Sequence, residues 1–172
     1  MPSRLRRQIK DPDLTDQGRK DCCKFAGKVF PDHEKYITAV YCSPMSRTIS
    51  TAAICLPNFA LIEIAFELQT VGNGPNGTGL EKREWLKRFG PQGSSEFAGR
   101  VNDYNSKIPS DWTAKDYGRW SADEIDWRVL EFMTVLRRCR QGSEVVVVSH
   151  GSFLKALVPG SKPKLIGREL FQ

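Results

Sequence analysis

A continuous run of β-branched residues constrains the fold of this chain more than any other feature. The segment 144–149 has the sequence EVVVVS and is followed at once by His150, Gly151 and Ser152. A short, unbroken apolar run is typical of a strand that is buried on both faces of a parallel sheet. Helices must then cover both faces of that sheet. We therefore predict an α/β fold, a three-layer sandwich with a mainly parallel sheet.

The rest of the chain alternates between helical and strand-like periods, as this fold requires. Ser121 and Glu124 are predicted to form a capping box for the clearest helix, which Gly142 should end. A further helix is expected to begin at Ser152 or Phe153. The other predicted elements are a helix from a Thr15 cap to about Phe30, a strand over Tyr36–Cys42, a helix after Pro44, a strand over Leu61–Leu68 and a helix near Leu80–Phe89.

Composition excludes several classes of protein. The 172 residues fit one domain, and no apolar run approaches the ~20 residues that span a bilayer. The amino-terminal segment has no apolar core like that of a secretory signal. Five cysteines with no Cys-x-x-Cys spacing favour reduced thiols in a cytoplasmic protein over disulfides or a metal site.

The net charge of +6 is concentrated near the amino terminus. Arg4, Arg6, Arg7 and Lys10 give residues 1–10 the character of a basic arm. Such an arm can bind nucleic acid or an acidic membrane, or attract anions towards a site in the domain. We favour a solvated terminus, because no aromatic residue or motif accompanies these charges.

Polar residues follow two of the predicted strands at the ends where parallel α/β sheets bind ligands. One set is Cys42-Ser43-Pro44-Met45-Ser46-Arg47-Thr48, and the other is Ser149-His150-Gly151-Ser152. Both lie where a helix should begin, and helix amino termini favour anions. The Arg47 guanidinium suits bidentate recognition of phosphate, and Gly151 allows close approach of the backbone. We expect Arg47 and His150 to converge in one pocket.

Three motifs in this order resemble the histidine phosphatase (phosphoglycerate-mutase-like) superfamily. DPDLTDQGRKDC is similar to the family's Asp-Pro-x-Leu-Thr-x-x-Gly segment, and CSPMSRTISTA to its Ser-Pro-x-x-Arg-Thr-x-x-Thr-Ala motif. VVVVSHGSFLKAL is similar to its closing Val-x-His-Gly segment. The stretches FELQT, RFG and WSADEIDWRVLEFMTVLR resemble a fungal branch of the family. The resemblance spans about Asp11 to Val158 and implies a single domain of this fold over residues 1–172.

The resemblance also implies roles for individual residues. Arg47 matches an arginine that grips the phosphoryl group, and His150 matches the second histidine, which stabilises the phosphoryl group in transfer. The backbone around Gly151 and Ser152 is expected to assist as further phosphate-binding groups, in line with electrostatic stabilisation of phosphoryl transfer. The implied ligand is a small phosphorylated metabolite or phosphate, with no cofactor and no metal.

The chain departs from the family pattern in its first segment. The family's nucleophile is a His in an Arg-His-Gly motif after a first strand that precedes the Asp-Pro-x-Leu-Thr segment. Only ten residues precede Asp11, so we expect this strand and motif to be missing. The strands at 36–42 and 144–149 must then pair with each other or leave an open edge.

A second departure concerns the acid that protonates the leaving group. The family branch has Glu-Leu-Gln-Glu where this chain has Glu67-Leu68-Gln69-Thr70, and a threonine is a poor acid. Glu67 is the candidate replacement, although alternation along a strand would point it elsewhere. The other histidine, His33, is expected on the surface at the amino end of its strand.

Two functions of different class follow. One is phosphoryl transfer or phosphomonoester hydrolysis on a small phosphorylated metabolite, if a further segment supplies the nucleophile. The other is a catalytically degenerate relative, a pseudoenzyme, that binds an anionic ligand or a protein partner. Nucleic acid and membranes are not favoured as partners.

Other motifs are weaker. Gly72, Gly74 and Gly77 match a dinucleotide fingerprint in form, but Pro75 interrupts it, and we favour a mobile loop. Cys42 lies too close to Arg47 for a cysteine phosphatase loop. Trp112, Trp120 and Trp127 are expected to pack in the core or a lid.

Overall fold

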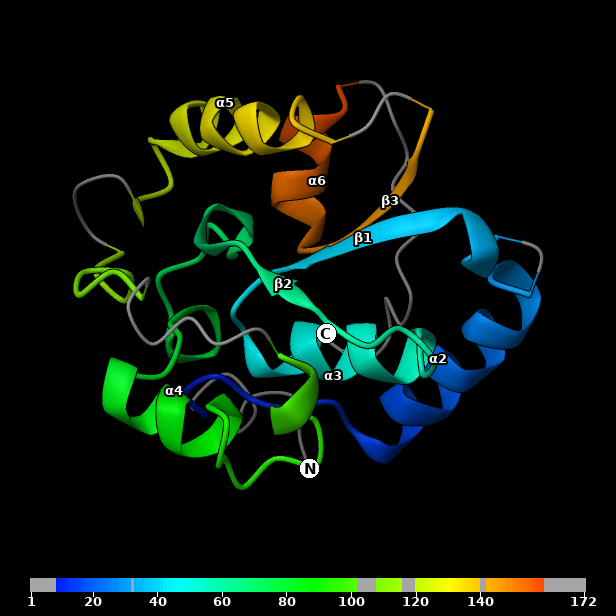
Figure 1. Cartoon of the computed structure of the whole chain (residues 1–172). Helices are drawn as coiled ribbons and strands as arrows, with labels where there is room; N and C mark the ends of the chain where they lie inside the picture. Colours follow the sequence, from blue (N-terminus) through cyan, green and yellow to red (C-terminus); the bar gives the residue numbers. More distant parts are fainter. Residues whose placement is uncertain (1–8, 32, 102–107, 116–119, 140–141, 160–172) are drawn as a thin grey trace.

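In the part of the chain that the structure describes, three parallel strands form the sheet (Figure 1). The structure is a computed structural model that describes residues 9–31, 33–101, 108–115, 120–139 and 142–159. The central strand β1 (Ile37–Cys42) pairs with β2 (Glu63–Ile64) on one side and with β3 (Glu144–Val148) on the other. Cys42 is the register partner of both Ile64 and Val148, so the carboxyl ends of all three strands meet at one edge.

Helices cover both faces of the sheet (Figure 1). On one face α2 (Asp16–Val29) packs against α3 (Ser46–Cys55), and α4 (Lys82–Phe89) adds Trp85 and Phe89 to the same core. On the other face α5 (Ile125–Leu136) packs against α6 (Gly151–Leu157). Successive side chains of β1 alternate between these cores, because neighbouring residues of a strand point to opposite faces. Val40 joins the first core and Tyr41 the second.

The predicted α/β class with a parallel sheet is confirmed. Thr15 caps α2 as expected, because its Oγ1 accepts the backbone N–H of Gly18 at 3.1 Å. The two long strands, α3 and α4 all lie within a few residues of their predicted positions. The short 3-10 turns of the described chain are η1 (Glu34–Tyr36), η2 (Phe66–Leu68), η3 (Pro75–Gly77) and η4 (Ala98–Arg100).

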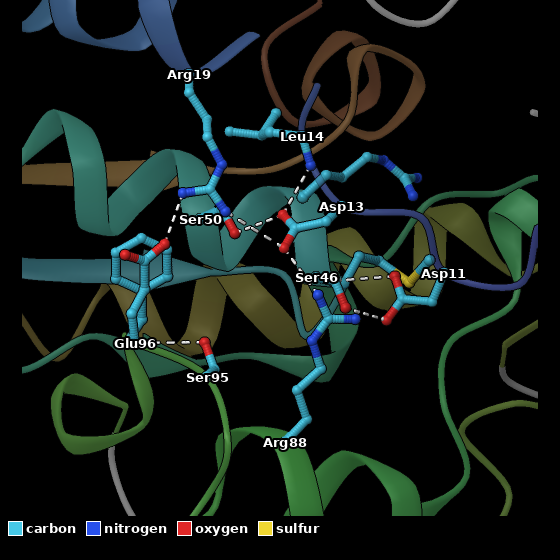
Figure 2. A network of polar contacts seen from close by, with 12 residues as sticks. Asp11, Asp13, Leu14, Arg19, Ser46, Ser50, Arg88, Ser95 and Glu96 are labelled. Atoms are coloured by element: carbon cyan, nitrogen blue, oxygen red, sulfur yellow. Dashed lines mark hydrogen bonds and ion pairs between the residues drawn. The ribbon is translucent and has the colours of Figure 1, made fainter. Parts of the chain in front are cut away.

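Residues remote in sequence satisfy both ends of α3. Its N-cap, Met45, offers no side-chain hydrogen bond. Instead the buried carboxylate of Asp11 accepts the backbone N–H of Ser46 at 2.9 Å and the Ser46 hydroxyl at 2.7 Å (Figure 2). At the other end the Arg100 guanidinium donates to the carbonyls of Ala53, at 2.6 Å, and Leu56. These contacts fix the helix that carries Arg47.

The predicted strand over Leu61–Leu68 is wrong beyond its first half. Only Glu63–Ile64 pairs as strand β2, and the chain then turns into η2. The physical reason lies in the backbone acceptors of residues 67–70, which side chains occupy in place of a neighbouring strand. Loss of the strand also removes the alternation on which the direction of Glu67 was predicted.

Two further predictions near α5 and β3 are wrong. Ser121 and Glu124 form no capping box, since the N-cap of α5 is Glu124 and makes no side-chain cap bond. The helix ends at Leu136, well before Gly142, whose φ of 83° suits a turn that only glycine adopts without strain. Residues Val145–Val148 are half-buried instead of fully buried. In the described chain β3 pairs with β1 only, so it lies at the edge of the sheet.

The tryptophans and the first histidine lie where the sequence placed them. Trp112 and Trp120 are buried, and Trp127 meets the Trp120 ring edge-on with centroids 6.3 Å apart. His33 is exposed at the amino ends of β1 and β3, where its Nδ1 lies 3.2 Å from a carboxylate oxygen of Glu144. His33 is therefore remote from the edge at which the strands end.

Replacing the remote cap should destabilise the whole fold. We expect Asp11→Ala to lower the free energy of unfolding by about 1–3 kcal/mol, because it removes a helix cap and leaves the buried Ser46 N–H without an acceptor. Urea unfolding of Asp11→Ala beside Asp123→Ala, an exposed aspartate, measures the difference. Equal losses in the two variants would show that the Asp11 cap is not a stabilising contact.

Candidate functional site

The strand ends of β1 and β3 are joined at Ser43 and His150. The backbone N–H of Ser43 donates to the carbonyl of Val148 at 2.9 Å, which extends the ladder by one bond. The Ser43 hydroxyl lies 3.0 Å from Nε2 of His150. His150 is the N-cap of α6, so the end of β3 and the start of α6 present it directly to Ser43.

Arg47 reaches the other nitrogen of the same imidazole. Its Nη2 donates to Nδ1 of His150 at 3.3 Å, and its Nη1 donates to the carbonyl of Asn76 at 2.9 Å. A guanidinium can only donate, so Nδ1 must be the acceptor. His150 is then the Nε2–H tautomer and donates to the Ser43 hydroxyl. The structure thus brings Arg47 and His150 together at the edge where the strands end.

The imidazole of His150 is held neutral by its surroundings. Burial lowers the pKa of His150 well below 6.5, and the positive charges of Arg47, Lys115 and Arg128 lower it further. Both effects oppose protonation, in agreement with the hydrogen bond that Nδ1 accepts from Arg47. A neutral imidazole surrounded by cations favours binding of an anion over binding of a cation.

The loop 72–77 contributes to the site through its backbone carbonyls. Pro75–Gly77 forms η3, and the carbonyls of Pro75 and Asn76 accept from the Asp11 backbone N–H, at 3.2 Å, and from Arg47. Gly77 is required there, because a Cβ would lie 2.3 Å from the carbonyl oxygen of Gly72. The loop therefore holds Nη1 of Arg47, while Nη2 donates to His150.

Two buried cations that the sequence did not predict, Arg128 and Lys115, also belong to the site. Arg128 of α5 is fully buried and donates through Nη1 to the carbonyl of Gln69 at 2.8 Å. Lys115 is 5% exposed and donates to the carbonyl of Thr70 at 2.8 Å. The sequence signal for Arg128 was its position on the apolar face of a predicted helix, because a buried arginine needs hydrogen-bond partners. Lys115 lies in an irregular region and had no such signal.

These cations converge on the segment 67–70. Four successive backbone carbonyls of this segment accept hydrogen bonds, and the three donors are all side chains. The Ser149 hydroxyl donates to Leu68 at 2.6 Å, which ties the segment to the residue before His150. The donors to the other three carbonyls are Arg128 and Lys115.

The remaining predicted site residues occupy less direct positions. Glu67 is half-buried in η2, and its carboxylate raises the pKa of Arg128 against the lowering effect of burial. Thr70, at the position expected for the proton donor, is bound to Lys115 through its backbone carbonyl. Gly151 and Ser152 are the first two residues of α6, with Ser152 exposed. Cys42 is buried, which raises the pKa of its thiol and leaves it a poor nucleophile.

A second polar network stands beside the site and holds its helices together (Figure 2). The Asp13 carboxylate accepts from Ser50 of α3 at 2.6 Å and from Arg88 of α4 at 2.8 Å. Arg19 of α2 lies 3.7 Å from the same carboxylate and donates to Glu96 at 2.6 Å. The two aspartates of the 11–13 segment therefore have different tasks, one as the cap of α3 and one as a link between three helices.

Other features of the described chain offer no competing site. An open groove of about 490 Å³ runs along Thr38–Tyr41 and is bordered by Glu63 and Arg138, but it contains none of the residues above. The described residues contain no group of three potential metal ligands. No helix in that part of the chain is both long and apolar enough to cross a membrane. Lys10, the described part of the basic arm, pairs with Glu81 at 3.3 Å, and residues 1–8 lie outside the described ranges.

Comparison with known proteins decides the family. The model of the histidine phosphatase superfamily, branch 1, matches residues 3–161. The chain belongs to the histidine phosphatase superfamily. A structure of a phosphoserine phosphatase mutant from Entamoeba histolytica in complex with phosphoserine is similar, with a TM-score of 0.51 and 15% identity over 89% of this chain and 70% of that chain. At this identity the likeness concerns the fold alone. No curated protein matches the chain.

In this histidine phosphatase superfamily member, the buried ammonium of Lys115 makes a testable contribution to stability. Burial and the charges of Arg128 and Arg47 lower the pKa of Lys115 from 10.5 to about 7. Between these values the unfolded chain holds a proton that the folded protein lacks, so Lys115 makes stability rise with pH across that window.

We expect Lys115→Met to raise the free energy of unfolding at pH 7 by roughly 2–4 kcal/mol, since each pKa unit is worth about 1.4 kcal/mol and the lost bond to Thr70 offsets about 1. The rise of stability with pH above 7 should also disappear. Urea unfolding at several pH values tests this, with the exposed Lys82→Met as control. A variant that keeps the wild-type slope would contradict it.

Proposed function

We propose that the Arg47–His150 site binds the phosphoryl group of a small phosphorylated metabolite, as expected of a phosphatase- or mutase-like protein of this superfamily. The observation that carries the proposal is the hydrogen bond of 3.3 Å between Arg47 and His150 at the carboxyl ends of β1 and β3. Arg47 supplies the charge-assisted fork, and His150 supplies an Nε2–H donor now held by Ser43. The backbone of Gly151 and Ser152 lies beside them at the start of α6.

Turnover by a phosphohistidine route needs a nucleophilic imidazole as well. The 172 residues contain two histidines, and His33 lies at the opposite end of the sheet. The Nδ1 lone pair of His150 is engaged with Arg47. We therefore propose that this chain binds the phosphoryl group, and that it turns it over only where a further segment supplies the nucleophile. Glu67, whose carboxylate acts on Arg128, is the candidate proton donor, since Thr70 is a poor acid.

The finer predictions from the sequence fit this proposal. They are the fungal-type branch of the superfamily, one domain over residues 1–172 and a cytoplasmic location. A pseudoenzyme that binds an anion without turnover is the second candidate, and the engaged lone pair of His150 favours it.

Phosphate binding tests the proposal directly. We expect inorganic phosphate to bind the wild-type protein and to bind Arg47→Met more weakly by about 1.5–3 kcal/mol, the scale of a lost charge-assisted hydrogen bond. Titration calorimetry measures both, with Arg83→Met, an exposed arginine of α4, as matched control and circular dichroism as a check of folding. Arg47→Met that binds as tightly as the wild type would remove the basis of the proposal.

The covalent step has its own test. We expect no phosphohistidine in the 172-residue protein after incubation with a phosphomonoester, because the only imidazole at the site donates to Ser43 and accepts from Arg47. Acid-labile phosphorylation is followed by intact-mass spectrometry, with His150→Gln as control. An acid-labile label on His150 that is absent from His150→Gln would overturn the assignment of His150 as a stabilising residue alone.

A further inference from the structure

Two cysteines lie in contact with each other where α2 packs against α3. All five cysteines of the chain are free thiols in the structure. Cys22 of α2 and Cys55 of α3 are buried in the same core, with exposed fractions of 2% and 4%. The Cys55 Sγ lies 3.6 Å from the carbonyl oxygen of Cys22, and the two thiols hydrogen-bond to each other. Two thiols in contact on different helices are a candidate site of disulfide formation.

Small side chains bring these two helices close together. The buried residues of α2 are Gly18 and Cys22, which lie one turn apart on the same face of the helix. On α3 the residues that meet this face are Thr51 and Cys55, also one turn apart, and the Cys22 Sγ lies 3.8 Å from the Thr51 hydroxyl oxygen. A disulfide needs Cα atoms within about 7 Å of each other and side chains that point together. The close packing of α2 on α3 favours both conditions (Figure 1).

The two thiols differ in how readily they lose a proton. The hydrogen bond with Cys55 lowers the pKa of Cys22 from 9.0 to about 7, although burial acts in the opposite direction. The same hydrogen bond, together with burial, raises the pKa of Cys55. The thiolate is the reactive form of cysteine. Cys22 is therefore the nucleophile of the pair, and Cys55 is the thiol that can react with an oxidised Cys22.

The pair lies just below the surface of α2. Cys23, the next residue of the helix, is exposed, and Asp21, the previous residue, is half-buried. Hydrogen peroxide is little larger than water, so a local opening of α2 admits it without unfolding of the whole domain. The remaining thiols lie elsewhere: Cys42 is fully buried in β1, and Cys139 lies beside the Tyr41 hydroxyl with 3.7 Å between sulfur and oxygen.

We propose that Cys22 and Cys55 form a peroxide-sensitive thiol pair that closes a reversible disulfide between α2 and α3. The Cys22 thiolate attacks one oxygen of hydrogen peroxide, the O–O bond breaks, and the leaving hydroxide takes a proton to become water. Cys22 is then a sulfenic acid. The Cys55 sulfur attacks the sulfur of Cys22, the S–O bond breaks, and a second water leaves with the proton of Cys55. Two thiols and one peroxide thus give one disulfide and two waters.

Oxidation would act on the helix that carries Arg47. The Thr51 hydroxyl, which faces the sulfur of Cys22, donates to the carbonyl of Arg47 at 2.8 Å. Cys22 and Cys55 are 33 positions apart in the sequence, so their disulfide would close a long loop and restrict the unfolded chain. The oxidised protein should therefore be the more stable form, with α3 joined covalently to α2.

Peptide mapping after treatment with hydrogen peroxide tests the pair directly. We expect the folded wild-type chain at low concentration to become two hydrogens lighter, with Cys55 linked to the tryptic peptide that contains Cys22 and Cys23. Cys23→Ala, which changes only the exposed neighbour, should form the same link, and Cys22→Ala should not. The product should melt at least about 5 °C above the reduced protein, and dithiothreitol should restore both the mass and the Tm.

Trapping of the sulfenic acid separates the roles of the two thiols. Cys55→Ser keeps a hydroxyl donor beside Cys22 but cannot form the disulfide, so dimedone should label Cys22 in this variant after exposure to peroxide. In Cys22→Ser, dimedone should leave Cys55 unlabelled at the same dose. Both variants are made on the Cys23→Ala background, so that the exposed thiol takes no label, and circular dichroism checks their folding.

Several outcomes would overturn the inference. One is a wild-type protein whose Cys22 and Cys55 stay free thiols in excess peroxide, and another is a disulfide that joins Cys55 to Cys23. Equal labelling of Cys55 in Cys22→Ser and of Cys22 in Cys55→Ser would overturn the assignment of Cys22 as the nucleophile. The mapping uses the wild-type chain, so it decides the matter even where a variant fails to fold. None of these measurements involves phosphate, and the proposed function is tested separately.

Discussion

The carboxylate of Asp11 fixes the helix on which the candidate site depends. It accepts the first free N–H of α3 and the hydroxyl of Ser46, in place of a cap that Met45 does not supply. Arg47 follows Ser46 directly, so this contact fixes the backbone from which the Arg47 side chain extends. Because Asp11 also donates its N–H to the carbonyl of Pro75, the same residue positions the loop whose Asn76 carbonyl accepts from Arg47. Burial raises the pKa of Asp11, and the two hydrogen bonds from Ser46 act in the opposite direction by favouring the carboxylate.

The sequence predicted the site better where its residues lie next to regular elements. The ends of β1 and β3 could be predicted because each strand is a short apolar run that can be identified from neighbouring residues alone. The helices that start at Ser46 and Gly151 begin where polar residues follow those runs. Arg47 and His150 could therefore be placed at one edge of the sheet. The prediction for segment 61–68 was wrong because its apolar residues also suit a strand. In the structure, side chains from distant parts of the chain occupy the backbone acceptors at its end. No local pattern encodes those partners.

Lys115 and Arg128 are site residues that the sequence could not predict, for the same reason. Their burial depends on how α5 and an irregular segment pack against residues 67–70, which is a tertiary property. A capping box at Ser121 and Glu124 looked sound in isolation, yet the helix begins later, at Ile125. Ser121 is buried instead, close in sequence to the buried Trp120.

The buried cations have a consequence for how this protein is handled. The positive charges of Arg47 and Arg128 oppose protonation of Lys115, and an oxyanion bound at the proposed site would offset this repulsion and stabilise the fold. A purification in phosphate or sulfate and one in Tris chloride would therefore yield samples of different resistance to heat and proteases. The anion content of the buffer would then determine the thermal and proteolytic stability that is measured for a preparation.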